Sequence, residues 1–411
     1  MQWRWEMNSA PYRVLLVATH PVQYATPIFR KMAHHPKLDI LVAFCSLQGA
    51  KAGTDPGFGM EVAWDIPLLE GYPWVELRNC ALRPRLGRFF GLVNPGIWKL
   101  ARSEKFDAVI FFTGYLYSTF WIGFTAAQVS RKPLLFATDA HTLGSLDKQN
   151  WKVHLKRWVL PWIYSLPDVV IVPSSGGFEL IRSLGIPAKR IALTPYTVDN
   201  EWWIHQAQNV NRAEVRGRWG IPLDASVVLF CGKLQPWKRP QDLLRAFAEA
   251  NISNAWLAIA GEGPLRASLE EEAKSMGIFN HVRFLGFVNQ SALPEVYSSV
   301  DLFVLPSDYE AFGVVVNEAM LCGCPVIVSD RVGARFDLLQ EGETGFVFPA
   351  GDVSSLARIL KEVLPDRQRL QIISRAAAHR MASWSPHDNI EATVRAVEQA
   401  VRLRSRLPGE R

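Results

Sequence analysis

The feature that most constrains the fold is an alternation of short apolar runs with helical patterns along almost the whole 411-residue chain. The apolar runs are rich in β-branched and aromatic residues, as buried strands are, and this rhythm is typical of parallel sheets wrapped by helices. A first series lies at 13–18, 38–45, 107–112, 133–137 and 168–172, and a second series at 226–231, 255–260, 282–286, 301–307 and 325–330. The sequence therefore predicts an α/β protein with two doubly wound, Rossmann-like domains that face each other across a cleft.

The segment at 194–210 separates the two series. It is polar and aromatic, contains a proline and has no clear period, so we place the hinge there. We expect a first domain at 1–198 and a second at 199–384. Within the remaining 385–411, apolar residues recur at helical spacing, which predicts an amphipathic helix that crosses back to the first domain. Because open parallel sheets bind ligands at the carboxyl ends of their strands, we expect the site between the domains.

Cysteine usage and apolar segments bear on the compartment. Five cysteines are an odd number, widely spread, in a chain too long to need disulfides, which predicts a reducing, cytoplasmic environment. The first thirteen residues lack the apolar run of a secretory signal. The uncharged segment 108–129 is long enough to span a bilayer, but Gly114 separates a strand-like part from a helix-like part. We therefore predict a buried strand, a turn and a helix there.

The net charge of +6 is unevenly distributed. Residues 1–200 contain 22 Lys and Arg against 14 Asp and Glu, whereas the rest of the chain contains 23 against 25. The basic half has two patches that combine basic and aromatic residues: Arg83, Arg85, Arg88, Phe89 and Phe90, and then Trp151, Lys152, Lys156, Arg157, Trp158 and Trp162. They fit either an anionic membrane surface or a solvated helix face with core tryptophans. No nucleic-acid-binding module accompanies the charge, so we expect no nucleic acid partner.

Two glutamates dominate the segment at 301–330, which reads as strand, loop, helix and strand. Glu310 falls in the loop and Glu318 on the helix, five residues beyond Gly313 and therefore about 7 Å along the axis. Helical side chains lean toward the N-terminus, so both carboxylates can approach one ligand. The simpler alternatives are a turn residue for Glu310 and an exposed helix carboxylate for Glu318.

The start of that helix predicts an anion site, because free amides near Phe312, Gly313 and Val314 can bind a phosphate. Carboxylates repel phosphate, so we expect Glu318 to accept hydrogen bonds from a ribose diol and Glu310 from a sugar. A second segment, 231–247, is a strand and a loop that present Lys233 and Lys238 before a helix. Two ammonium groups there can hold a diphosphate and neutralise it as it leaves, although loop lysines are also common on surfaces.

Together these segments resemble the family four retaining glycosyltransferases, which have the GT-B fold of two facing Rossmann-like domains. The resemblance is strongest over 226–352. It rests on the Glu-x7-Glu spacing in EAFGVVVNE (310–318) and on the Gly-Lys-Leu loop with a lysine downstream in GKLQPWK (232–238). Three further motifs support it: AGEGP (260–264), FLGFV (284–288) and ETGFVFPAGD (343–352).

The resemblance implies specific donor contacts. Lys233 and Lys238, beside Gly232, would bind the donor diphosphate. Glu310 and the amides after it would bind the donor sugar and Glu318 the ribose, with Phe287 and Val288 beside the base. Lys233 stands where arginine is more usual, which keeps the charge and loses the bidentate fork.

The first domain shows weaker signals. HPVQY, at 20–24, follows the first strand and resembles a variant start of some bacterial family members without the usual glycine pair, which places His20, Gln23 and Tyr24 on the acceptor side. Asp139 and His141 follow another strand, where family members often carry a histidine near the reacting sugar. We predict His141 first and Asp139 second as catalytic residues, together with Lys238 and Glu310. A helix-capping aspartate and a loop histidine are the alternatives.

The resemblance implies a retaining hexosyltransferase that moves a sugar from a nucleotide-diphosphate sugar, most often UDP, to a hydroxyl of a saccharide or lipid-linked cell-envelope polysaccharide intermediate. The acceptor would attack on the face that the diphosphate leaves. The chain contains no Asp-x-Asp, so we expect neither a metal nor another cofactor. We expect a cytoplasmic protein, peripheral at the membrane if the basic patches bind lipid. The alternatives are another GT-B enzyme such as a nucleotide-sugar epimerase, and a non-catalytic, membrane-associated scaffold subunit.

Overall fold

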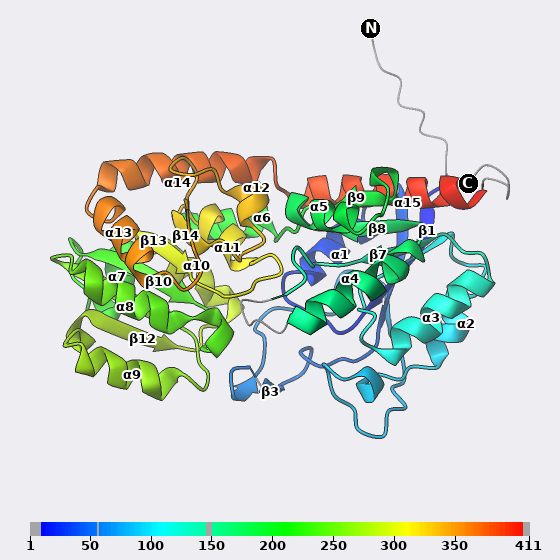
Figure 1. Cartoon of the computed structure of the whole chain (residues 1–411), viewed down its shortest axis with the longest axis horizontal. Coiled ribbons are helices and arrows are strands. Elements are labelled where there is room, and N and C mark those ends of the chain that lie inside the picture. The colour runs from blue at the N-terminus through cyan, green and yellow to red at the C-terminus, as the bar shows by residue number, and fades with distance from the viewer. Residues whose placement is uncertain (1–9, 56, 145–149, 406–411) are drawn as a thin grey trace, which may run out of the picture.

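The computed structural model describes residues 10–55, 57–144 and 150–405, which form two lobes, each with a parallel sheet between helices (Figure 1). In the first lobe the strand order is β5-β2-β1-β6-β7-β8-β9, and every described pairing is parallel. These strands are β1 (Tyr12–Ala18), β2 (Leu38–Phe44), β5 (Trp74–Glu76), β6 (Ala108–Phe111), β7 (Leu134–Ala137), β8 (Val169–Val172) and β9 (Ile191–Leu193).

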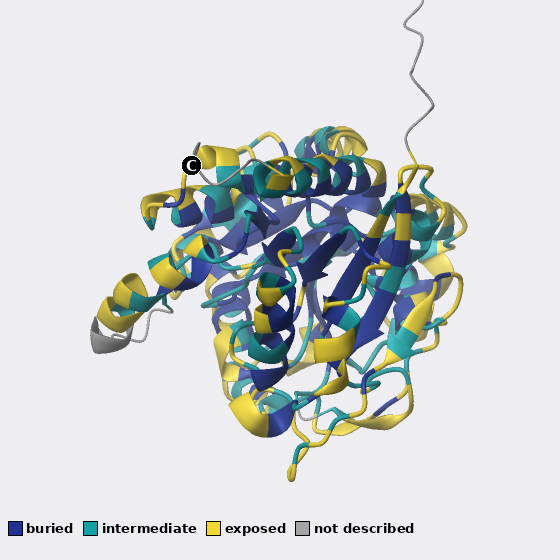
Figure 2. Cartoon of the chain, turned by 90° about the vertical axis from the view of Figure 1, so that its right-hand side faces the viewer, coloured by how far each residue is buried: buried dark blue, intermediate teal, exposed yellow. Residues whose placement is uncertain are grey.

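Helices cover both faces of the first sheet, which explains why its strands are continuous apolar runs. On β1, Val14 and Leu16 pack with one helical layer, and Leu15 and Val17 pack with the other. Figure 2 shows the buried strands between more exposed outer helices. The helices of this lobe are α1 (Thr26–Ala33), α2 (Gly96–Ala101), α3 (Ser118–Val129), α4 (Asn150–Ser165) and α5 (Ser175–Ser183), joined by the last helix, α15 (Pro386–Ser405).

The second lobe repeats this architecture with the strand order β12-β11-β10-β13-β14-β15. Its strands are β10 (Ser226–Cys231), β11 (Ala255–Ala260), β12 (Val282–Gly286), β13 (Leu302–Leu305), β14 (Val326–Ser329) and β15 (Phe346–Phe348). Its helices are α6 (Asn200–Gln208), α7 (Arg212–Trp219), α8 (Pro240–Ala250), α9 (Arg266–Ser275), α10 (Leu293–Ser298), α11 (Val315–Leu321), α12 (Arg335–Leu338), α13 (Val353–Val363) and α14 (Arg367–Ala382).

The predicted fold class is confirmed, and each predicted strand has a counterpart within two residues at either end. The uncharged segment 108–129 contains β6 and α3, separated by a turn. Among the described residues, no helix has the length and apolar character needed to cross a bilayer. The strands that the sequence did not predict include β5, β9 and β15, which lie at sheet edges. Each is three residues long, which is too short to show an alternating pattern of apolar and polar residues.

Two chain crossings connect the lobes and are bonded to each other. The first lies just before α6, which occupies part of the segment where the sequence shows no period. The second joins α14 to α15, and α15 packs its apolar residues against the first sheet. The carbonyl oxygen of Tyr196 in the first crossing accepts hydrogen bonds from Trp384 Nε1 and Asn317 Nδ2, both at 2.9 Å. Asn389 Nδ2 donates to Pro195 O at 2.7 Å.

A short hairpin that the sequence did not predict also belongs to the first lobe. Its strands, β3 (Gly53–Asp55) and β4 (Met60–Val62), pair antiparallel outside the main sheet. Figure 1 shows β3 below the junction of the two lobes. We call residues 53–55 and 57–65 the arm, because they extend from the first lobe to the second.

Candidate functional site

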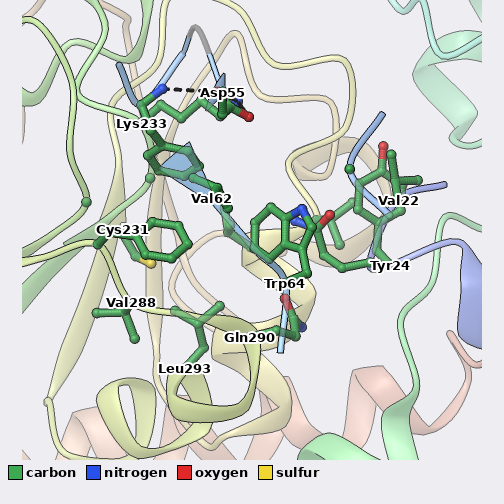
Figure 3. Close-up of a pocket in the computed structure, with 18 of the residues that line it drawn as sticks. Val22, Tyr24, Asp55, Val62, Trp64, Cys231, Lys233, Val288, Gln290 and Leu293 are labelled. Atoms are coloured by element: carbon green, nitrogen blue, oxygen red, sulfur yellow. Dashed lines mark hydrogen bonds and ion pairs between the residues drawn. The ribbon is translucent and has the colours of Figure 1, made fainter. Parts of the chain in front are cut away.

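A cavity of about 710 Å³ lies between the lobes, at the carboxyl ends of strands from both sheets (Figure 3). Fourteen of the fifteen residues that the sequence singled out line it: His20, Gln23, Tyr24, Asp139, Gly232, Lys233, Lys238, Phe287, Val288, Glu310, Phe312, Gly313, Val314 and Glu318. These residues are up to 298 positions apart in the chain, and the two-lobed fold brings them to one space. The expected position of the site, between the domains, agrees with this geometry.

Glycines permit the loops after β10 and β11 to pack closely. Gly232 and Gly261 have φ of +154° and +145°, a region that L-residues rarely adopt. A Cβ on Gly261 would lie 1.9 Å from the carbonyl oxygen of Gly232, a clash that no rotamer relieves. The AGEGP motif is therefore a packing requirement that fixes the loop leading to Lys233.

Lys238 and Glu310 form one charged unit on the second lobe. Lys238 ends a 3-10 turn, Pro236–Lys238, and its Nζ pairs with Glu310 Oε1. Ser307 Oγ donates to the same carboxylate oxygen at 2.9 Å. The two side chains are only 18% and 15% exposed, so each depends on the other for charge compensation. Glu310 is thus more than an exposed turn residue.

The loop at Glu310 is hydrogen-bonded to the loop that follows the neighbouring strand, β14. Glu310 N donates to Arg331 O at 3.2 Å, and Gly333 N donates to Glu310 O at 3.1 Å. A Cβ on Gly333 would lie 2.2 Å from Ala311 O, so this contact requires glycine. Within the described part of the chain, the amides of Phe312, Gly313 and Val314 donate to no other group. They remain able to bind an anion in the cavity.

Glu318 is buried on α11, only 5% exposed, which rules out an exposed helix carboxylate. Tyr297 Oη donates to its Oε2 at 3.2 Å. Burial raises the pKa of Glu318 to about 7, against the opposing effect of hydrogen bonds from Tyr297 and Gln290. The carboxyl group therefore titrates near neutral pH while it faces the cavity.

Lys233 has a partner that the sequence did not predict. Its Nζ lies 2.8 and 2.9 Å from the two carboxylate oxygens of Asp55, which belongs to the arm. The same ammonium group lies 4.8 Å from the centre of the Phe58 ring. In Figure 3 the Lys233 and Asp55 side chains meet at one end of the cavity.

The arm also provides aromatic residues that sequence reasoning missed. The rings of Phe58 and Phe287 meet edge to face, with centroids 4.9 Å apart, and Trp64 lies 6.0 Å from Phe287. Both arm residues line the cavity. The signal was present as a turn-forming Asp-Pro-Gly at 55–57 beside aromatic residues, but it contains nothing that points to the second lobe.

Asp139 and His20 of the first lobe line the cavity and have shifted pKa values. Burial raises the pKa of Asp139, which favours its protonated form. Burial, reinforced by the charge of Lys233, lowers the pKa of His20, so that its ring is neutral at pH 7. Among the described groups, nothing hydrogen-bonds to His20 Nδ1. The Tyr196 hydroxyl donates a hydrogen bond to the Tyr24 hydroxyl at 3.2 Å.

His141 does not line the cavity. Its Nδ1 lies 3.0 Å from Ala311 O, and its ring stacks on Tyr309 with centroids 5.6 Å apart. Burial lowers the pKa of His141, so the neutral ring donates to this carbonyl. The histidine therefore connects the first lobe to the loop that carries Glu310, and of the two predicted first-lobe residues Asp139 is the one that faces the cavity.

A second cavity of about 560 Å³ is lined mostly by the first lobe, with Tyr309 from the second, and shares His20, Val22, Tyr24, Asp139 and Tyr196 with the first cavity. Its lining is mainly apolar and aromatic: Ile28, Phe29, Met32, Phe112, Tyr115, Leu116, Phe136, Leu143, Leu160 and Tyr164. In the described residues, no three His, Cys, Asp or Glu side chains are grouped as metal ligands.

Comparisons with known proteins agree with this architecture. The family model described as Glycosyl transferases group 1 matches residues 211–380, and the model described as Glycosyltransferase Family 4 matches residues 55–202. An uncharacterized glycosyltransferase of Methanocaldococcus jannaschii is 29% identical over 299 residues, which are 70% of this chain and 75% of that protein. A D-inositol 3-phosphate glycosyltransferase of Kineococcus radiotolerans is 30% identical over 55% of this chain and 56% of its own length.

A sulfoquinovosyl transferase of Arabidopsis thaliana is 30% identical over 61% of this chain, which spans 49% of that protein. The chain thus spans only about half the length of these last two relatives.

Solved structures share the fold over nearly the full length. The Anabaena protein HepE, in complex with UDP and glucose, has a TM-score of 0.68 at 21% identity, over 93% of this chain and 98% of that one. Sucrose-phosphate synthase from Thermosynechococcus elongatus has a TM-score of 0.73 at 21% identity, over 94% and 98%. With one family model on each lobe, the chain belongs to the family four type of GT-B glycosyltransferases.

Proposed function

We propose that this glycosyltransferase is a retaining enzyme that moves a hexose from a UDP-sugar to a hydroxyl acceptor. The observation that carries the proposal is one cavity lined by two lysines, Lys233 and Lys238, and by two carboxylates, Glu310 and Glu318. Ammonium groups match a diphosphate, and carboxylates match sugar and ribose hydroxyls. The choice of uracil is supported by the fold relative HepE, which was solved with UDP-glucose.

The proposed reaction uses electrostatics rather than a protein nucleophile. The bond from the sugar anomeric carbon to the β-phosphate oxygen breaks, and the acceptor oxygen bonds to that carbon on the same face. The leaving phosphate takes the acceptor's proton, while Lys233 and Lys238 stabilise its developing charge. In this scheme the lysines supply the charge that a metal ion supplies elsewhere, and the reaction needs no metal cofactor.

The remaining residues divide by position. Glu310 would accept hydrogen bonds from the sugar and Glu318 from the ribose, with Phe287 and Val288 beside the base. Asp139 lines both cavities, so we propose that it meets the sugar and the acceptor. His141, bonded to Ala311 O, would be a positioning residue for the Glu310 loop.

We propose that the acceptor has an apolar part, as a lipid-linked saccharide does. The second cavity adjoins Asp139 and is lined mainly by apolar and aromatic side chains. One stripe of α4, formed by Lys156, Leu160 and Tyr164, lines this cavity. Their spacing of four residues places them on one helix face.

The opposite stripe of α4 supports peripheral attachment to the cytoplasmic face of a membrane. Leu155, Trp158 and Trp162 are 51%, 85% and 57% exposed, which argues against core tryptophans. Arg157 is exposed beside them, Lys156 is exposed on the cavity side of the helix, and the other basic patch exposes Phe89 and Phe90 with Arg83, Arg85 and Arg88. The side chains of Trp151 and Lys152 lie outside the described residues. Amphipathic aromatic and basic side chains favour an anionic lipid surface.

Replacement of Lys238 tests the donor assignment. Lys238→Ala should reduce both transfer and slow hydrolysis of the UDP-sugar by about 100-fold or more, because a cation at the leaving group is lost. A panel of nucleotide sugars assayed by nucleotide release, with and without EDTA, gives the measurement, and EDTA should have no effect. Lys361→Ala, on α13, is the control. Near-normal activity of Lys238→Ala would contradict the diphosphate role.

The pKa of Glu318 predicts a pH dependence of donor binding. An ionised carboxylate accepts both ribose hydroxyls, so affinity should be full above the pKa of about 7 and should fall as the pH decreases through it. From pH 8 to pH 6 the loss should reach up to about tenfold. Cys231 and Tyr297, which face Glu318, have pKa values raised by burial and stay neutral in this range.

Calorimetric titration with an intact UDP-sugar is suitable, because esterification removes the phosphate ionisation near pH 6. Glu318→Gln should bind more weakly and with a flat profile. An unchanged pH dependence in this variant would assign the titration to another group.

Acceptors of different apolar length test the second cavity. Octyl glycosides should have a KM at least about tenfold below that of the matching methyl glycosides, since two buried methylenes suffice for that difference. Leu116→Asp, at a position that is 64% exposed, should remove most of this preference and leave donor hydrolysis unchanged. Equal KM values for both glycosides with the wild type would exclude an apolar acceptor site.

Vesicle co-sedimentation tests the membrane surface. The wild type should bind phosphatidylglycerol-containing vesicles more strongly than phosphatidylcholine vesicles, and Trp158→Ser should weaken binding at least about threefold. Leu223→Ser, at a 59% exposed site on the second lobe, serves as a matched control and should have no effect. If Trp158→Ser and Leu223→Ser bound the phosphatidylglycerol-containing vesicles equally, α4 would not be the membrane contact.

A further inference from the structure

The arm of the first lobe makes a continuous set of contacts with the donor side of the second lobe. Gln235 Nε2 donates to Gly57 O at 2.6 Å, and Asn289 Nδ2 donates to Ala63 O at 2.7 Å. At the end of the arm, Ser291 N donates to Asp65 Oδ1 at 3.1 Å. The arm is therefore anchored to the loop that follows β10 and to the segment that follows β12, which carries Phe287.

Within this contact, Asp55 engages the cation that the donor diphosphate requires. Both of its carboxylate oxygens lie within 2.9 Å of Lys233 Nζ. The two side chains are 26% and 36% exposed, so the pair is only partly screened by water. A diphosphate at Lys233 would lie next to a carboxylate of the same sign.

The backbone of the arm fixes the direction of this carboxylate. Asp55 Oδ1 accepts hydrogen bonds from Gly57 N at 2.7 Å and Phe58 N at 3.1 Å. A Cβ on Gly57 would lie 2.6 Å from Lys233 Cδ, which shows how closely the turn approaches the lysine. Burial raises the pKa of Asp55, but hydrogen bonding and attraction from Lys233 outweigh it and lower the pKa overall, so the group is ionised at pH 7.

The aromatic residues of the arm place it inside the donor cavity. Phe58 and Trp64 line the cavity and contact Phe287, the residue beside the proposed base position. Figure 3 shows Trp64 among the lining side chains, between Val62 and Tyr24. One short segment therefore contributes a wall near the nucleoside and a negative charge near the diphosphate.

We propose that the arm is a gate of the donor site, in which Asp55 competes with the donor diphosphate for Lys233. The inference rests on the proposed function and extends it. Entry of the diphosphate displaces the Asp55 carboxylate from the Lys233 ammonium group, because the two negative groups repel each other at close range. When the nucleotide product leaves, Asp55 pairs with Lys233 again, so this ammonium group is not left without a partner. Product release therefore costs less free energy. Asp55 thus weakens product retention and favours turnover.

The substitution Asp55→Asn separates charge from structure. Asparagine keeps the oxygen that accepts from Gly57 and Phe58, so the turn is preserved while the negative charge is removed. Calorimetric binding of UDP should become about three- to tenfold tighter at low salt, and the gain should shrink as salt screens the charge. Uridine, which lacks phosphates, should bind both proteins equally. Asp65→Asn, also on the arm but bonded to Ser291 rather than to a lysine, should leave UDP affinity unchanged.

The outcomes are distinct. Unchanged or weaker UDP binding by Asp55→Asn would overturn the gate, and a parallel loss of uridine affinity would identify Asp55 as a purely structural latch. An equal gain in Asp65→Asn would also overturn it, because loosening of the arm rather than its charge would then be responsible. Failure of both wild type and Asp55→Asn to bind UDP, GDP or ADP would contradict the proposed function itself.

Discussion

The rest of the structure depends on hydrogen bonds at Tyr196. They join the chain crossing before α6 to the crossing between α14 and α15. The Tyr196 carbonyl accepts from Trp384 and Asn317, while its ring stacks on Phe312 at 5.5 Å. Phe312 stacks in turn on Trp384, so the junction is continuous with the loop that follows Glu310. Because the cavity exists only where two sheet ends face each other, this junction sets the distance between the first-lobe loops and the second-lobe residues that line the cavity.

Charge compensation in the cavity has two different origins. Lys238 pairs with Glu310 on its own lobe, whereas Lys233 pairs with Asp55 on the other. An ammonium group that is partly shielded from water needs a carboxylate partner. A displacement of the lobes separates such a pair only when the carboxylate belongs to the other lobe. Movement of the first lobe leaves the Lys238 pair intact but alters the surroundings of Lys233. The charges in the cavity therefore depend on the arrangement of the lobes.

The sequence predicted which second-lobe residues lie together because its motifs are local. Glu310 and Glu318 are eight residues apart, and Lys238 follows Gly232 by six, so strand, loop and helix geometry nearly determine their positions. Asp55 and Lys233 are 178 positions apart, and neither segment contains a pattern that reports the other. His141 was assigned to the correct strand end, but its orientation follows from Ala311 on the other lobe, which no local pattern contains.

A common principle connects these nonlocal contacts. His141 reaches the loop of Glu310, and the arm reaches Lys233 and Phe287, so two first-lobe loops contact second-lobe residues that line the first cavity. The second, mainly apolar cavity beside Asp139 is lined mostly by first-lobe residues, with Tyr309 from the second lobe. Under the proposed function, an acceptor in that cavity would contact the lobe that carries both loops. A shift of that lobe would then change the charges around the donor directly, because the loops belong to it.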